Sequence, residues 1–208
     1  DNSTQTVAAG TNPNAVAVNP VTNKIYVANN GSTNVTVIDG TNNTTATVAA
    51  GTNPQDVAVN PVTNKIYVAN FSSGNVTVID GTNNSTQTVA AGTAPYAVAV
   101  NPVTNKIYVA NINSSNVTVI DGTNNSTATV TAGVNPGAVA VNPVTNKIFV
   151  ANEGSSNVTV IDGTNNTTAT VTAGAFPQAV AVNPVTNKIY VANTGSANVT
   201  VIDGSDNS

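Results

Sequence analysis

The chain has 208 residues and a mass of 20.7 kDa, with 7% charged residues, 4% aromatic residues and a net charge of −4. It contains no His, Cys, Met or Trp, which excludes Cys/His zinc sites, disulfides, haem ligation, thiol nucleophiles and a Ser-His-Asp triad. Its five scattered lysines cannot neutralise a run of phosphates, so we expect no nucleic-acid partner. No apolar run approaches the roughly 20 residues of a membrane span. We therefore expect no cofactor, no metal, no catalytic residue and no enzymatic activity.

The chain consists of five copies of one unit. The run Asn-Pro-Val-Thr-Asn-Lys begins at residues 19, 60, 101, 142 and 183, and Val-Ile-Asp-Gly recurs with the same period of 41 residues. A repeat of 40 to 50 residues is typical of one four-stranded propeller blade. The repeat predicts a single β-propeller domain over residues 1–208.

The first copy shows what each unit contains. It holds four runs rich in Val, Ile, Thr and Ala, at residues 15–18, 24–29, 34–39 and 44–49, separated by segments rich in Asn, Gly, Pro and Ser. Such runs predict β-strands, and no stretch has the apolar spacing of a helix. We expect an all-β, five-bladed propeller with four antiparallel strands per blade. The Ala-Val-Ala-Val run should be innermost, because small residues suit the crowded axis.

The fifth copy stops after its third run, and a matching fourth run stands at the other end of the chain. Ser3–Gly10 matches Ser85–Gly92 residue for residue. This predicts a ring closed by the N-terminal strand pairing with the C-terminal three, and therefore a monomer with no open blade edge. The alternative is a larger ring whose blades are shared between two chains.

The runs Ile25–Asn29 and Asn34–Asp39, with their four repetitions, resemble the YVTN family of β-propeller repeats. The resemblance implies a propeller fold and, for natural members, an extracellular or cell-surface setting. Of the 41 columns of the repeat, 28 hold one residue type in all five copies, exposed turns included. This near-identity also resembles an engineered or consensus-type symmetric scaffold, whose localisation the sequence does not indicate.

Variation between copies is concentrated in the segment entering the first strand and in the loop between the second and third strands, which should lie on one side of the disc. Loops there commonly surround the mouth of a propeller and carry ligand sites. The candidate ligand-binding residues are Asn14, Asn30, Gln55, Phe71, Tyr96, Ile112, Glu153, Phe176, Gln178 and Thr194. One interpretation is a module that binds a glycan or protein through this face, and the other is tolerated variation without a ligand. The recurring Asp-Gly pairs, such as Asp39-Gly40, predict hairpin turns rather than calcium loops.

Overall fold

A computed structural model describes residues 3–208 and contains five successive sheets, here called units 1 to 5. Unit 1 comprises β1 (Pro13–Asn19), β2 (Lys24–Asn29), β3 (Asn34–Asp39) and β4 (Thr45–Ala49). Unit 2 comprises β5 (Pro54–Asn60), β6 (Lys65–Asn70), β7 (Asn75–Asp80) and β8 (Thr86–Ala90). Unit 3 comprises β9 (Pro95–Asn101), β10 (Lys106–Asn111), β11 (Asn116–Asp121) and β12 (Thr127–Thr131). Unit 4 comprises β13 (Pro136–Asn142), β14 (Lys147–Asn152), β15 (Asn157–Asp162) and β16 (Thr168–Thr172), with the 3-10 turn η1 (Glu153–Ser155) between β14 and β15. Unit 5 comprises β17 (Pro177–Asn183), β18 (Lys188–Asn193) and β19 (Asn198–Asp203).

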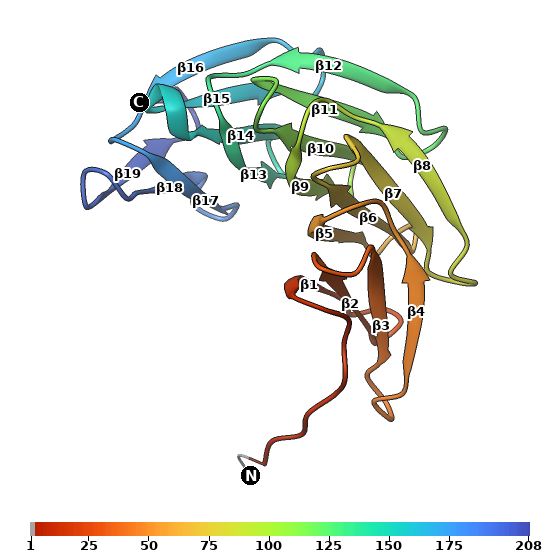
Figure 1. Cartoon of the computed structure of the whole chain (residues 1–208). Helices are drawn as coiled ribbons and strands as arrows, with labels where there is room; N and C mark the ends of the chain where they lie inside the picture. Colours follow the sequence, from red (N-terminus) through yellow and green to blue (C-terminus); the bar gives the residue numbers. More distant parts are fainter. Residues whose placement is uncertain (1–2) are drawn as a thin grey trace.

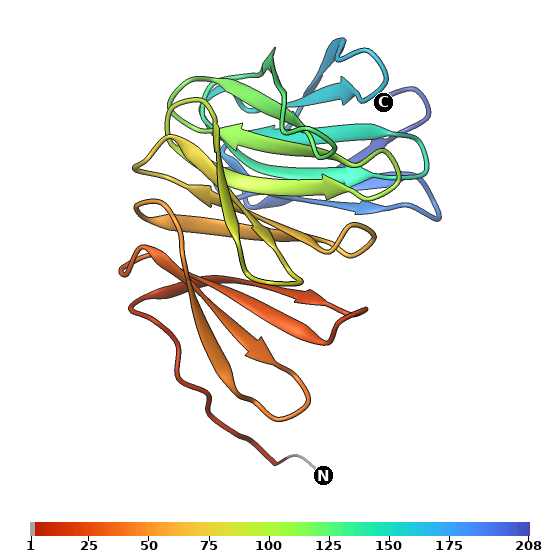
Figure 2. The same cartoon turned by 90° about the vertical axis from the view of Figure 1, so that its right-hand side faces the viewer.

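Each sheet is antiparallel, and its strands pair in chain order. The five sheets stand side by side around an arc, with β1, β5, β9, β13 and β17 along the concave side and β4, β8, β12 and β16 on the outer rim (Figures 1 and 2). The predicted all-β class, the strands of each repeat and the inner position of the Ala-Val-Ala-Val run are thus confirmed. The array is that of a five-bladed propeller.

Neighbouring units pack through two different faces, which we call forward and backward. The forward face of unit 1 consists of Tyr26, Ala28, Val35, Val37 and Val48, and it packs against the backward face of unit 2, which consists of Val57, Ile66, Val68 and Ile79. The same pair of faces meets again between units 2 and 3, 3 and 4, and 4 and 5. Because all these side chains are Val, Ile, Ala or aromatic, four repetitions of one apolar contact form the core.

A buried amide fixes the loop between the second and third strands of each unit. In unit 3, Asn111 Nδ2 donates to Asn116 Oδ1 at 2.8 Å and to Thr118 Oγ1 at 2.9 Å. Thr118 Oγ1 also accepts the Gly92 N–H of the linker at 3.2 Å. A β-carbon on Gly92 would lie 2.8 Å from Asn111 Cγ, so the linker needs glycine for this close approach. The same bonds recur in every unit.

The invariant turn between the first and second strands also makes specific bonds. Asn60 Oδ1 accepts the N–H of Val62 at 3.0 Å, and Asn60 Nδ2 donates to Asn105 Oδ1 of the next unit at 2.9 Å. Lys65 Nζ donates across the same boundary to the carbonyl of Gly122 at 3.4 Å. Two of the constant turn residues thus join neighbouring units. Near-identity of this turn therefore has a structural cause that the sequence alone does not show.

The structure corrects one detail of the expected ring, its closure. Residues 3–10 belong to no strand, unit 5 keeps three strands, and the N-terminal segment runs beside unit 1 while unit 5 lies at the opposite end of an open arc (Figure 1). The rotation between neighbouring units is set by the repeated packing of forward on backward face. Five units with that rotation do not return unit 5 to unit 1. A monomer with every blade edge covered does not follow from this arrangement.

Candidate functional site

The two groups of variable residues meet at the boundaries between units. The residue after the second strand of one unit lies beside the second residue of the first strand in the next unit, 25 positions later in the chain. The boundary pairs are Asn30 with Gln55, Phe71 with Tyr96 and Glu153 with Gln178. The sequence prediction that both groups share one side of the molecule is thus confirmed for these pairs.

The boundary between units 1 and 2 is polar. Asn30 Nδ2 donates to Gln55 Oε1 at 2.9 Å, and Asn14 Nδ2 donates to the Gln55 carbonyl at 2.7 Å. Asn53 Nδ2 donates to the carbonyl of Asn30 at 3.1 Å. These candidate residues therefore bind one another, and their amides are already engaged in the unit boundary.

The boundary between units 2 and 3 is aromatic. The rings of Phe71 and Tyr96 meet edge to face, with centroids 6.3 Å apart and planes at 72°. Tyr96 is 36% exposed. An edge-to-face pair of this kind is favourable beyond its apolar area, and it leaves ring surface open to solvent.

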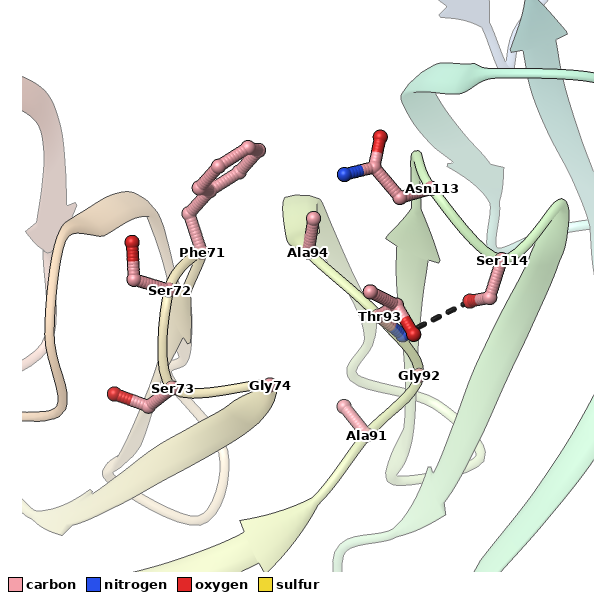
Figure 3. Close-up of a pocket in the computed structure, with 10 residues that line it drawn as sticks. All are labelled: Phe71, Ser72, Ser73, Gly74, Ala91, Gly92, Thr93, Ala94, Asn113 and Ser114. Carbon is pink, nitrogen blue, oxygen red and sulfur yellow. Dashed lines mark hydrogen bonds between the residues drawn. The ribbon is translucent and has the colours of Figure 1, made fainter.

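A groove of about 460 Å³ is lined by Phe71 of this pair. In Figure 3 Phe71 stands on one wall with Ser72 and Ser73 below it, Ala94 and Thr93 lie across from them, and Asn113 points in from the unit 3 loop. The Thr93 N–H donates to Ser114 Oγ at 2.9 Å on the far wall. All ten residues that line the groove are uncharged. The groove thus combines one aromatic wall with hydroxyl and amide groups.

The remaining candidates do not gather into one site. Glu153 Oε1 accepts Gln178 Nε2 at 3.4 Å between units 4 and 5. Thr194 Oγ1 donates to the carbonyl of Phe176, a residue that is 53% exposed. Ile112 accepts at its carbonyl an amide N–H of Asn135 at 3.1 Å. The candidates are therefore distributed along the arc, one boundary after another.

Two features of the variable segments were not among the candidate ligand-binding residues predicted from the sequence. Asn113 and the serines of the Phe71 loop line the groove, although only their place in a variable loop marked them. Asp56 lies on the inner strand β5, where the other units have Ala, and its Oδ2 accepts the Val98 N–H of unit 3 at 2.9 Å. Burial raises the pKa of the Asp56 carboxyl, and hydrogen bonds from Val98 and Val57 oppose that shift. The signal for Asp56 in the sequence was its uniqueness in the column.

The Asp-Gly turns are structural. Asp39 Oδ1 accepts the Thr41 N–H at 2.8 Å, and the Asp39 carbonyl accepts the Asn43 N–H at 2.8 Å. The hydroxyl of Thr41 donates to the same carboxylate, and this bond, with the backbone bond, lowers the pKa of Asp39. Within residues 3–208 no three acidic side chains gather as metal ligands would, and no helix is long and apolar enough to cross a bilayer.

Comparison with known proteins identifies the fold. No protein-family model and no curated protein matches the sequence. Among solved structures, a functionally unknown protein from Desulfotomaculum acetoxidans matches with a TM-score of 0.73 and 17% identity, over 93% of this chain and 69% of that one. A chain of the nidogen/laminin complex matches with a TM-score of 0.73 and 12% identity, over 94% and 77%. Hydrazine synthase of Kuenenia stuttgartiensis matches with a TM-score of 0.56 and 15% identity, over 98% of each chain. At these identities the likeness supports the propeller-type array and carries no function.

Proposed function

We propose that the chain is a non-catalytic β-propeller scaffold of engineered or consensus type, built from YVTN-like repeats. The observation that carries this proposal is the valine of the first turn. It is constant in all five units, and Val21, Val62, Val103, Val144 and Val185 are each between 74% and 92% exposed. The asparagine and lysine of the same turn have bonds that account for their constancy, whereas an exposed valine has no packing that would keep it constant. Copying of one unit accounts for it directly.

The absence of catalysis is part of the same proposal. Several hydroxyls and amides of the constant positions are engaged in the unit framework, as the bonds of Asn111, Thr118 and Asn60 illustrate. Asp56 and Glu153, the carboxylates of the variable segments, are bonded to a backbone amide and to a glutamine respectively. Neither arrangement pairs a base with a nucleophile.

A second candidate function is non-covalent binding in the groove beside Phe71. The specific observation is the partly buried ring of Phe71 facing uncharged hydroxyl and amide groups (Figure 3). Aromatic faces beside neutral hydrogen-bonding groups suit a glycan or a neutral peptide segment. One of the structural neighbours is part of a protein–protein complex, nidogen with laminin, which is a further reason to include protein ligands.

One experiment separates the two candidates. In a symmetrised variant, Phe71, Ile112 and Glu153 become Asn, and Tyr96 and Gly137 become Gln, while Gln178 is kept, so that each boundary carries the pair seen at Asn30 and Gln55. A pure scaffold predicts an unchanged circular dichroism spectrum, a melting temperature within a few degrees of the parent's, and no saturable binding by the parent on glycan and peptide arrays. Saturable binding by the parent that the folded symmetrised variant loses would reject the scaffold proposal and establish the groove as a binding site.

A further inference from the structure

The two ends of the arc expose the two faces that pack together everywhere else. On the forward face of unit 5, Tyr190, Val199 and Val201 are 41%, 57% and 48% exposed, whereas Tyr67, Val76 and Val78 in unit 2 are at most 4% exposed. On the backward face of unit 1, Val16 is 64% exposed, whereas its equivalent Val57 is 5% exposed. The ends are therefore the two halves of an apolar contact that the chain already forms four times.

Polar groups at the ends show the same complementarity. At three boundaries inside the arc, the turn lysine donates to the glycine carbonyl of the next unit, as Lys147 does to Gly204 at 2.9 Å. At the ends, the corresponding pair is Lys188 of unit 5 and Gly40 of unit 1. Lys188 bonds instead to Asp203 at 3.2 Å, and Gly40 is exposed where Gly204 is buried. The end faces thus match in this hydrogen bond as well as in apolar shape.

The N-terminal segment is held where the fourth strand of a preceding unit would lie. Gln5 Oε1 accepts Asn43 Nδ2 at 2.6 Å, as Gln87 Oε1 of β8 accepts Asn125 Nδ2 at 2.6 Å. The Gly10 N–H donates to Thr36 Oγ1 at 3.2 Å, as the linker Gly92 does to Thr118. Residues 4–10 therefore already make the bonds of an outermost strand to unit 1, while unit 5 is one strand short.

We propose that a second copy of this chain docks across the ends of the arc. The forward face of unit 5 in one copy packs on the backward face of unit 1 in the other, and residues 4–10 of the latter pair with β19 as the fourth strand. The contact continues the four unit boundaries inside the chain, including the variable pair, because Thr194 of one copy comes to the position facing Asn14 of the other. A head-to-tail contact of this kind generates a ring if its rotation closes and a filament if it does not.

The test uses the full chain and two single substitutions, Val16→Lys and Val201→Lys, with Val185→Lys as matched control. Val16 and Val201 lie on opposite ends, and Val185 is 92% exposed in a turn on neither face. Light scattering and native mass spectrometry should give twice 20.7 kDa or a higher multiple for the parent and for Val185→Lys. Each end variant should be monomeric, with association weakened ~100-fold or more, because docking would bury an unpaired ammonium group.

Mixing the two end variants provides the decisive measurement. Each retains one intact end, so the mixture should give a 1:1 dimer of twice 20.7 kDa that neither variant forms alone. A monomeric parent would overturn the proposal. In that case a lower melting temperature for both end variants would indicate that the chain closes on its own first unit. The proposal would also be wrong if the parent associates and only the control Val185→Lys is monomeric. That result would place the contact at the turn valines. Circular dichroism of each variant establishes that it is folded.

Discussion

The buried asparagine of each unit allows a quantitative test of what holds the units together. We consider Asn111→Ala in unit 3. Asn111 is fully buried, and its amide group donates the two bonds to Asn116 and Thr118 described above. Loss of two buried hydrogen bonds, each worth ~1 kcal/mol net, lowers the free energy of unfolding by about 2 kcal/mol. For a chain of this size that loss corresponds to a fall of roughly 4 to 8 °C in melting temperature.

The matched control is Asn113→Ala, two residues along the same loop. Asn113 is exposed, and the hydrogen bond of the loop at this position uses its backbone N–H and the Thr93 carbonyl, which the substitution keeps. We expect this control to change stability by no more than about 0.5 kcal/mol. Urea unfolding gives the free energy of unfolding of both variants, provided that their m-values are equal. Hydrogen exchange of the Gly92 amide reports locally on its bond to Thr118.

The repeat supplies an internal replicate. Asn70 and Asn152 make the same two bonds at the same 2.8 and 2.9 Å, so Asn70→Ala and Asn152→Ala should each cost what Asn111→Ala costs. Equal stability of Asn111→Ala and its control would refute the reasoning. A large loss at one unit and none at the others would show instead that the cost belongs to local strain and not to the shared network.

Three further substitutions test the left-handed backbone position of the linker and the buried carboxyl of Asp56. Phe176 has a φ of 52°, a left-handed conformation that disfavours a bulky residue, and the equivalent positions of units 2 and 4 hold Asn53 and Asn135. Phe176→Asn should therefore raise the free energy of unfolding by about 1 kcal/mol. Asn135→Ala should lower it, because the side-chain bond to the Ile112 carbonyl is lost, and thermal unfolding measures both variants. Burial raises the pKa of Asp56, so the folded state binds this proton more tightly than the unfolded state, and its contribution to stability is lost as pH rises through the folded pKa. The stability of Asp56→Asn relative to the parent should accordingly increase from pH 3 to pH 7, and a constant difference across that range would contradict the assignment.

The sequence predicts the strands and turns of each unit well, because the residue patterns that determine them lie within the unit. Strands 24–29 and 34–39 of the first copy coincide with β2 and β3, and the turns between them follow from Asn, Gly and Asp at positions that favour tight bends. Closure depends on a different quantity, the rotation between units. That rotation depends on the packing of residues such as Tyr26, Val57 and Ile66 across a boundary. The periodic pattern of the sequence does not predict the angle between neighbouring units.

The candidate site shows a similar division. The sequence identified the variable columns, and complementary pairs such as Glu153 with Gln178 were present in it at a constant separation. Recognising them as contacts required the offset between neighbouring units, which only the fold provides. The structural reason for the constancy of Asn60 and Lys65 could not be predicted from the sequence either, because their partners belong to the next unit.

The boundary pairs also affect how the units pack on one another during folding. The forward and backward faces are almost the same in every unit, so a unit could dock on any other with nearly equal energy, and near-identical repeats are prone to such misassembly. The boundary pairs are among the few features that distinguish one boundary from another: two amides at Asn30 and Gln55, two rings at Phe71 and Tyr96, and an acid with an amide at Glu153 and Gln178. Mismatching them places a ring or a carboxylate against the wrong group, at a cost that identical copies would not incur. The boundary pairs therefore distinguish the unit boundaries from one another.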